Sequence, residues 1–61
     1  MPYREGPQQA ELYYNMGIEA LERGNKGTAR SHLTMARAIA DYNSMYDLIR
    51  KIDKVLSQIS Q

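Results

Sequence analysis

The chain has 61 residues, a formal net charge of +1 and no cysteine, which limits it to one small domain and excludes disulfides and thiolate metal sites. The single histidine, His32, cannot hold a zinc or iron ion alone, so no metal or other cofactor is expected. The near-neutral charge gives no long-range attraction toward nucleic acid or acidic lipid. A chain this short buries only about 60% of its unfolded surface, so association with another chain is the remaining way to bury more apolar area.

The first six residues carry no apolar stretch of the kind found in signal peptides. No run of about 18 apolar residues follows, so no contact with a membrane is expected. The lack of cysteine fits a reducing compartment, and we therefore expect a cytoplasmic protein. Residues 1–6 are predicted to form a flexible leader.

A first helix is predicted from Pro7 to Arg23. Proline is accepted in the first turn of a helix, where its missing N–H is not needed, and most of the following residues favour helix. Tyr13, Met16 and Ala20 recur at spacings of three and four, which predicts that they form the buried face of this helix.

Gly24 and Asn25 predict a tight turn after the first helix. Glycine suits the left-handed position that ends a helix, and asparagine can cap the next one. The two helices on either side are then antiparallel neighbours. The second helix is predicted over 26–40, with one buried face that is rich in alanine; its members are Ala29, Leu33, Ala36, Ile39 and Ala40.

The third helix is predicted over 45–59 and has the strongest amphipathic pattern in the chain. Its apolar stripe consists of Met45, Leu48, Ile49, Ile52, Val55, Leu56 and Ile59. We expect this stripe either to cap the first two helices or to mediate self-association. Ser44 and Asp47 have the spacing of a capping box at the start of this helix, with Asp in place of the usual Glu.

The boundary between the second and third helices has an alternative. No glycine or proline lies between Ala40 and Met45, so one long helix over 26–59 is also compatible with the sequence. Such a helix cannot bury its far half within one chain, and this alternative therefore predicts a dimer.

The stretch from Ala10 to Asp41 resembles one tetratricopeptide repeat (TPR), a unit of two helices about 34 residues long. The residues that carry the resemblance match the aromatic, large and small positions of the first helix, the turn, and the small and large positions of the second helix. They are Tyr13, Met16 and Gly17, then Gly24 and Asn25, then Ala29, Leu33 and Ala36. The resemblance implies an all-α fold, with an antiparallel TPR-like hairpin over 7–41 followed by a C-terminal capping or interface helix within 42–61.

Three residues depart from the family pattern. Ala20 and Lys26 replace aromatic residues, which reduces the buried volume, and Asp41 replaces the proline that usually ends the unit. In this family the first helix lines a groove that holds a peptide or helix of a partner. The positions that the resemblance places in the groove are Glu11, Tyr14, Ile18, Leu21 and Glu22.

Ile18 and Leu21 are apolar and lie off the predicted core stripe, so some surface is expected to cover them. That surface is a partner segment, the third helix, or a second copy of the chain. The subset of the family that grips a C-terminal carboxylate uses Lys and Asn where this chain has Tyr14 and Ile18, so that mode of binding is not expected.

The other aromatic and charged residues give weaker indications of function. Tyr42 and Tyr46, near the predicted corner, either anchor an interface or fill the space left by the alanine-rich helix; we expect the latter. The basic residues of the third helix alternate with Asp47 and Asp53, which favours a solvated face over phosphate binding. His32 has no partner in the sequence for acid–base chemistry, and no catalytic activity is expected.

The sequence therefore predicts a non-catalytic protein–protein interaction module that binds a partner protein or peptide and also itself. The alternative is a small stoichiometric regulator that blocks a larger enzyme or transcription factor. A nucleic-acid-binding accessory is the least favoured of the three.

Overall fold

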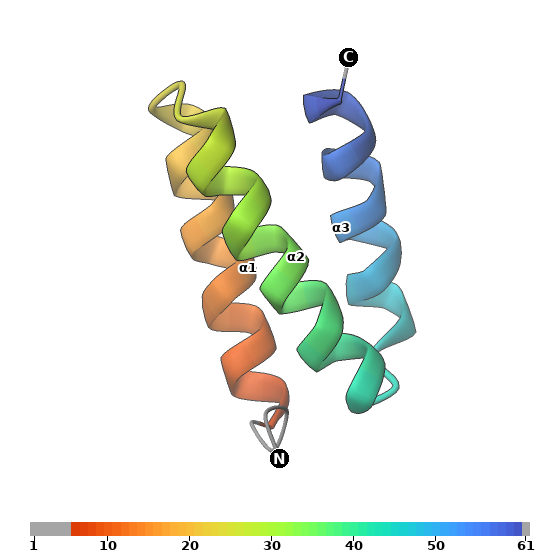
Figure 1. The fold of residues 1–61 in the computed structure, drawn as a ribbon. Helices are drawn as coiled ribbons and strands as arrows, with labels where there is room; N and C mark the ends of the chain where they lie inside the picture. Colours follow the sequence, from red (N-terminus) through yellow and green to blue (C-terminus); the bar gives the residue numbers. More distant parts are fainter. Residues whose placement is uncertain (1–5, 61) are drawn as a thin grey trace.

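The computed structural model describes residues 6–60 and is all-helical, with three helices in an up–down–up arrangement (Figure 1). Helix α1 spans Pro7–Glu22, α2 spans Lys26–Tyr42 and α3 spans Tyr46–Ile59. The prediction of an all-α fold of three helices is confirmed. The alternative of one helix over 26–59 is wrong, because the chain turns between Tyr42 and Tyr46. The predicted leader lies outside the described residues except for Gly6, which is the N-cap residue of α1.

The α1–α2 turn has the geometry that Gly24 predicts. Gly24 has φ of 80°, and its N–H donates to the carbonyl of Leu21 at 2.9 Å. The N–H of Asn25 donates to the carbonyl of Ala20, also at 2.9 Å. These two bonds form a Schellman motif, which satisfies carbonyls that the end of α1 leaves unpaired. Asn25 does occupy the N-cap position of α2, but its side chain makes no capping hydrogen bond.

The α2–α3 turn repeats the same motif with a serine in the glycine position. Ser44 has φ of 56° and donates its N–H to the carbonyl of Asp41, while Met45 donates to the carbonyl of Ala40 at 2.8 Å. The Asn43 side chain adds a bond from Nδ2 to the carbonyl of Ile39. The predicted capping box at Ser44 is therefore wrong: Met45 is the N-cap residue of α3 and no side chain caps it.

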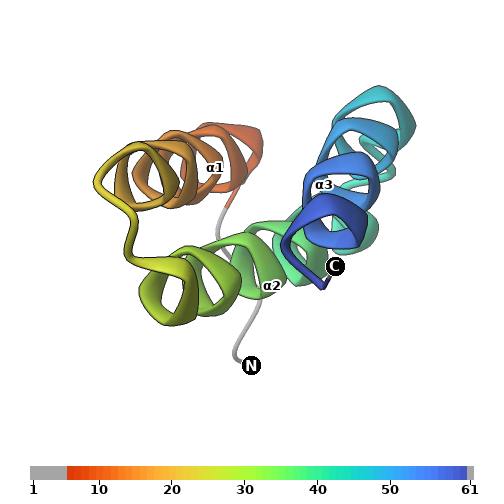
Figure 2. The ribbon, with the colours of Figure 1, turned by 90° about the horizontal axis from the view of Figure 1, so that it is seen from above.

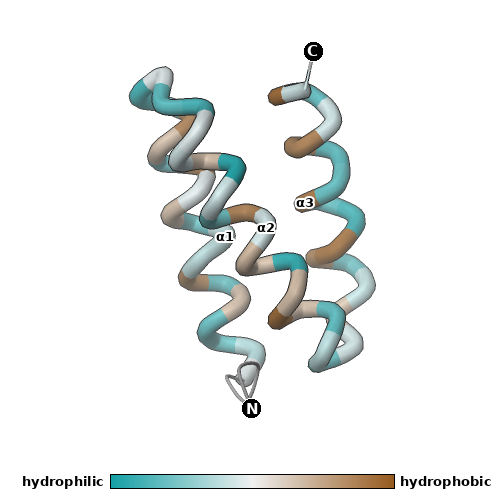
Figure 3. Tube along the Cα trace, in the orientation of Figure 1, coloured by the Kyte–Doolittle hydropathy of each residue, from teal (hydrophilic) through white to brown (hydrophobic). Residues whose placement is uncertain are grey.

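Helix α2 is the element on which the other two pack. Figure 2 shows α1 and α3 on the same side of α2 but apart from each other. Both pack on α2, whereas among the described residues they make no contact of comparable extent with each other. The apolar stretches of α3 lie on the side that faces α2 (Figure 3). The buried apolar side chains form one cluster: Ala10, Ala20, Ala29, Leu33, Ala36, Ile39, Ala40, Leu48, Ile52 and Ile59.

The core of the hairpin depends on close approach rather than on large side chains. Gly17 is buried, and a Cβ atom added to it would lie 2.7 Å from Cγ of Leu33 and 3.3 Å from the carbonyl oxygen of Ala29. Leu33 is fully buried, so its side chain fills the space that the glycine leaves open. Sequence analysis placed Gly17 and Leu33 at a small and a large position of the repeat pattern, and the structure brings these two residues together.

The buried face of α1 differs from the predicted stripe. Ala10, Gly17 and Ala20 are buried, Tyr13 and Met16 are half-buried, and Leu12 remains 51% exposed. Tyr13 packs against the core cluster and its ring lies 6.2 Å from the ring of His32. The small residues face α2 and allow the two helix axes to lie close together. The larger side chains lie on the flanks of the contact.

We expect Gly17→Ala to destabilise the fold, although alanine is the better helix former. The added methyl group must displace Leu33 in a packed core, which costs about 1–3 kcal/mol, while the gain in helix propensity is at most about 1 kcal/mol. Urea unfolding followed by circular dichroism measures the net change.

Gly27→Ala is the matched control for this prediction. Gly27 is also in a helix, but nothing lies within 4 Å of an added Cβ, so this variant should gain stability. Equal stabilisation by the two variants would show that the α1–α2 contact is looser than the structure indicates.

Candidate functional site

A pocket of about 420 Å³ lies between the N-terminal ends of α1 and α3. It exists because α1 and α3 both lie on α2 with their axes apart (Figures 1 and 2). Its lining combines apolar and charged side chains from α1, the α2–α3 turn and the first two turns of α3: Glu11, Ser44, Met45, Tyr46, Asp47, Leu48 and Lys51.

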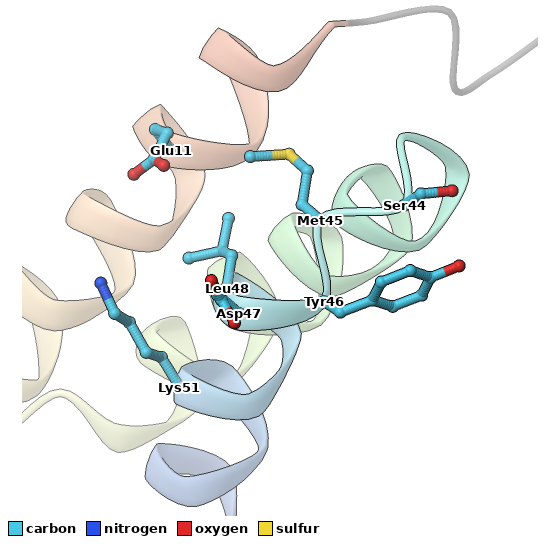
Figure 4. A pocket seen from close by; sticks show the side chains of 7 residues that line it. All are labelled: Glu11, Ser44, Met45, Tyr46, Asp47, Leu48 and Lys51. Carbon is cyan, nitrogen blue, oxygen red and sulfur yellow. The ribbon is translucent and has the colours of Figure 1, made fainter.

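The side chains of the pocket come from opposite sides (Figure 4). Met45 extends from the start of α3 toward α1, and Leu48 lies between the two helices. Glu11 and Lys51 reach the pocket from α1 and α3, respectively, whereas the ring of Tyr46 points away from it. The pocket therefore has an apolar centre, and its lining also holds two acidic groups, Glu11 and Asp47, and one basic group, Lys51.

No ion pair joins Glu11 to Lys51, and neither side chain has an ionic partner elsewhere in residues 6–60. Both residues are exposed, so water satisfies their charges in the free protein. Asp47 differs, because it forms an ion pair with Arg50 one turn later on α3. A carboxylate and an ammonium group at the pocket thus have no ionic partner among the described residues.

The five residues that sequence analysis placed in the groove lie in different surroundings in the structure. Glu11 lines the pocket, and Ile18 follows it by two helical turns, which places Ile18 on the same face of α1. Ile18 is half-buried and does not belong to the core cluster or to the side chains that pack against it. Tyr14 is half-buried and packs on the core cluster, and its spacing from Glu11 keeps it on the same face.

Leu21 does not lie off the core as predicted, because it also packs against the core cluster. Glu22 is exposed at the last position of α1. We refer below to Glu11, Tyr14 and Ile18 as the pocket face of α1.

The apolar stripe of α3 lies within the chain's own core. Leu48, Ile52 and Ile59 are buried, and the other members, Met45, Ile49, Val55 and Leu56, are half-buried and pack against the same cluster. The stripe therefore covers α2, and little of it remains for contact with a second copy. Met45 and Leu48 also reach the pocket, and Lys51, which the sequence assigned to the solvated face of α3, lies at its edge.

Lys51 was missed because a single charged residue beside an amphipathic stripe carries no signal of its own. Its spacing of three from Leu48 places it on the flank of the stripe. This flank faces α1 only because α3 packs parallel to α1, and a helix periodicity contains no information about that arrangement.

A bidentate ion pair joins α2 to α3 beside their apolar contact. The Arg37 Nε atom lies 2.6 Å from Oδ1 of Asp53, and Nη2 lies 3.2 Å from Oδ2. The hydrogen bond from Arg37 lowers the pKa of Asp53, against an opposing effect of desolvation, and it raises the pKa of Arg37. Asp53 follows Lys51 by two residues, which places the pair on the opposite side of α3 from Lys51.

Tyr42 and Tyr46 do not fill space in the core. They are 62% and 63% exposed, and the prediction that they fill a gap is wrong. The gap does not exist, because the alanine-rich face of α2 is in close contact with α1 and α3. Their exposure keeps the alternative of an interface role open.

The described residues bring together few of the side chains that metal binding or acid–base catalysis requires. Residues 6–60 contain no cluster of three or more His, Asp or Glu side chains that could hold a metal ion. None of the helices described is long and apolar enough to cross a membrane. The His32 ring faces Tyr13, and none of the ion pairs or hydrogen bonds found among these residues involves it.

Comparison with known proteins gave no match to a family model, to a curated protein or to a solved structure.

We expect Asp53→Asn to destabilise the protein at neutral pH by the small amount typical of an exposed pair. Because the pKa of Asp53 is lowered in the folded state, its contribution is fully present above the ordinary value of 3.8 and is lost as the pH falls below that value. The difference in stability between the wild type and Asp53→Asn should therefore shrink from pH 6 to pH 3.

Thermal unfolding across this range tests the expectation, and Asp47→Asn is the control. Asp47 pairs only with Arg50 within α3 and joins no two helices. A difference between the wild type and Asp53→Asn that stays constant down to pH 3 would contradict a role for the Arg37–Asp53 pair.

Proposed function

We propose that this protein is a non-catalytic protein–protein interaction module that binds a segment of a partner chain in the pocket between α1 and α3. The pocket face of α1 and the first two turns of α3 form the contact. The bound segment is an amphipathic helix or an extended peptide, since both are recognised by apolar contacts flanked by polar ones. The proposal places the protein in the cytoplasm, in line with its lack of cysteine.

The observation that carries the proposal is the combination of the apolar centre and the unpaired charges at its edge. Met45 and Leu48 offer apolar surface to an anchoring side chain, while Glu11 and Lys51 have no ionic partners among the described residues. Charged groups of opposite sign on the two walls favour one orientation of a bound segment over the reverse. A small domain of this kind commonly uses its concave surface for binding.

The resemblance to a TPR hairpin supports the same proposal independently of the pocket. In that family the first helix of the pair lines the binding groove, and the corresponding residues here include Glu11, Tyr14 and Ile18. The close contact of Gly17 with Leu33 is compatible with the tight helix pair of such a unit. We therefore propose that α1 and α3 correspond to the walls of a minimal groove, with α2 behind them.

The proposal predicts that Ile18→Asp abolishes the binding of peptides selected for affinity to the wild-type protein. Ile18 is outside the core cluster, so an aspartate there should leave the fold intact while placing a charge on the pocket face of α1. The measurement is selection from a displayed random peptide library, followed by titration of each selected peptide against the wild type and the variant.

Leu12→Asp is the matched control. Leu12 is on the same helix and is also apolar and exposed, but it lies away from the pocket face. Selected peptides should bind Leu12→Asp as they bind the wild type and bind Ile18→Asp at least about tenfold more weakly, a loss of about 1.4 kcal/mol. Failure to select any peptide, or equal binding to the two variants, would reject the proposed function.

A further inference from the structure

The α2–α3 turn holds a serine in a backbone conformation that serine rarely adopts. Among the described residues other than glycine, Ser44 alone has a positive φ, of 56°. In this left-handed region the Cβ atom of an L-residue lies too close to the backbone that follows it. The equivalent position of the α1–α2 turn is occupied by Gly24, which has no Cβ atom. The two turns have the same hydrogen bonds, but only the second one is strained.

The chain departs from helical geometry mainly at two residues of this turn. Asn43 still donates its N–H to the carbonyl of Ile39, as it would inside a helix. Ser44 and Met45 then redirect the chain, Ser44 through its positive φ and Met45 through its ψ of 72°. No glycine or proline lies between Ala40 and Met45, so the turn contains no residue that breaks a helix. A change of backbone angles at these two residues would join α2 and α3 into one helix.

A joined helix would also satisfy backbone groups that the turn leaves to solvent. Met45 is the N-cap residue of α3, and no side chain caps this helix. The N–H groups of the first three residues of α3 therefore have no partner in the helix or its cap. In a joined helix each of them donates to the carbonyl four residues earlier. Opening the turn thus removes the strain at Ser44 and adds backbone hydrogen bonds, and its cost is the separation of α3 from α2.

The surface of α2 that this separation uncovers has a known occupant, because α3 itself covers it. Helix α3 packs on α2 and makes no comparable contact with α1 (Figure 1), so α3 can leave without disturbing the α1–α2 hairpin. The α3 of a second copy offers the same fully buried Ile52 and the same partner for Arg37. Arg37 and Asp53, which pair in the monomer, lie eight residues before and after Met45. Two joined helices that cross antiparallel at Met45 therefore bring Arg37 of each copy level with Asp53 of the other.

We propose that Ser44 and Met45 form a hinge through which two copies of the chain exchange α3. In the exchanged dimer α3 of each copy packs on α2 of the other. The turn of the monomer holds α3 near its own α2 at an effective concentration of about a millimolar, so the monomer prevails in dilute solution. Strain in a short hinge favours exchange, and the dimer should accumulate as the protein concentration approaches that range. Ser44 and Met45 also line the pocket, but the exchange does not require a bound partner, and the two proposals can fail separately.

Substitutions of Ser44 test the hinge in both directions. Ser44→Gly removes the strain of the turn, as Gly24 does in the α1–α2 turn, and should weaken dimerisation at least about tenfold. Ser44→Ala keeps a Cβ atom at this position and favours the joined helix, so it should dimerise more tightly than the wild type. The measurement is sedimentation velocity of the full chain, after incubation at a series of concentrations that is long enough for α3 to exchange.

Ser57→Gly is the matched control for the Ser44 variants. Ser57 is exposed within α3, so glycine there weakens the same helix in the monomer and in the dimer and should leave their ratio unchanged. A second readout separates exchange from any other mode of dimerisation. In an equimolar mixture of carbon-13-labelled and unlabelled wild-type chains, the dimer should give nuclear Overhauser effects between α2 protons of one chain and α3 protons of the other.

Three results would overturn the proposal. The first is that the wild type and Ser44→Ala both sediment as monomers up to about a millimolar. The second is a dimer of the wild type that Ser44→Gly leaves as tight as before. The third is a dimer in which all contacts between α2 and α3 stay within one chain, because the two copies would then associate through another surface with the turn still formed.

Discussion

The close approach of α1 to α2 at Gly17 is the contact on which the other features depend. Because glycine has no side chain there, Leu33 of α2 is fully buried against the backbone of α1. The remaining contact is made largely by alanines, which contribute little area each but allow two helices to lie close together. The hairpin therefore uses few large side chains in its own core, and Tyr14 and Ile18 are left on the flank that continues from the pocket. Helix α3 supplies most of the branched aliphatic side chains and completes a core that the hairpin alone lacks.

Both α1 and α3 pack on α2, and this arrangement explains the shape of the protein surface. Helix α2 presents one arc of its circumference to both neighbours, so α1 and α3 lie on one side of it without packing extensively on each other. The Arg37–Asp53 pair lies on the flank of α3 toward α2, and the unpaired Lys51 lies on the flank toward α1. The pocket is thus a consequence of this shared arc. The opposite side of α2 is left uncovered for the same reason.

Much of the fold can be predicted from the sequence, because the patterns that indicate it involve residues close to each other in the chain. The left-handed Gly24 turn and the amphipathic α3 depend on residues within a few positions of each other, and both were predicted. The break after Tyr42 was predicted for the wrong reason: Ser44 resembles a cap in the sequence, yet it takes the left-handed position that glycine takes in the first turn. A serine is rarely found in this conformation, so no sequence pattern indicates it. The α2–α3 turn is recognisable only from its hydrogen bonds, which repeat those of the α1–α2 turn.

The candidate site was less predictable because it depends on the relative positions of helices. The resemblance to a TPR unit pointed to Glu11, which lines the pocket, whereas Lys51 becomes part of the pocket only through the parallel packing of α1 and α3. Leu21 was misassigned because the core of the hairpin is centred on Ala10, Gly17 and Ala20 instead of on Met16. Residues this small carry almost no hydrophobic signal, so the periodicity favours the larger neighbours at the flank of the contact.

The central claim is that α1 and α3 pack on α2 and leave the pocket face of α1 open. Nuclear Overhauser effects between protons of the free protein in solution test this most directly. We predict contacts from the methyl groups of Leu33 to the Hα protons of Gly17 and none from the methyl groups of Ile18 to those of Val55 or Leu56 in α3. A network of contacts between Ile18 and these α3 residues would show that the two helices close on each other and that α3 covers the pocket face of α1.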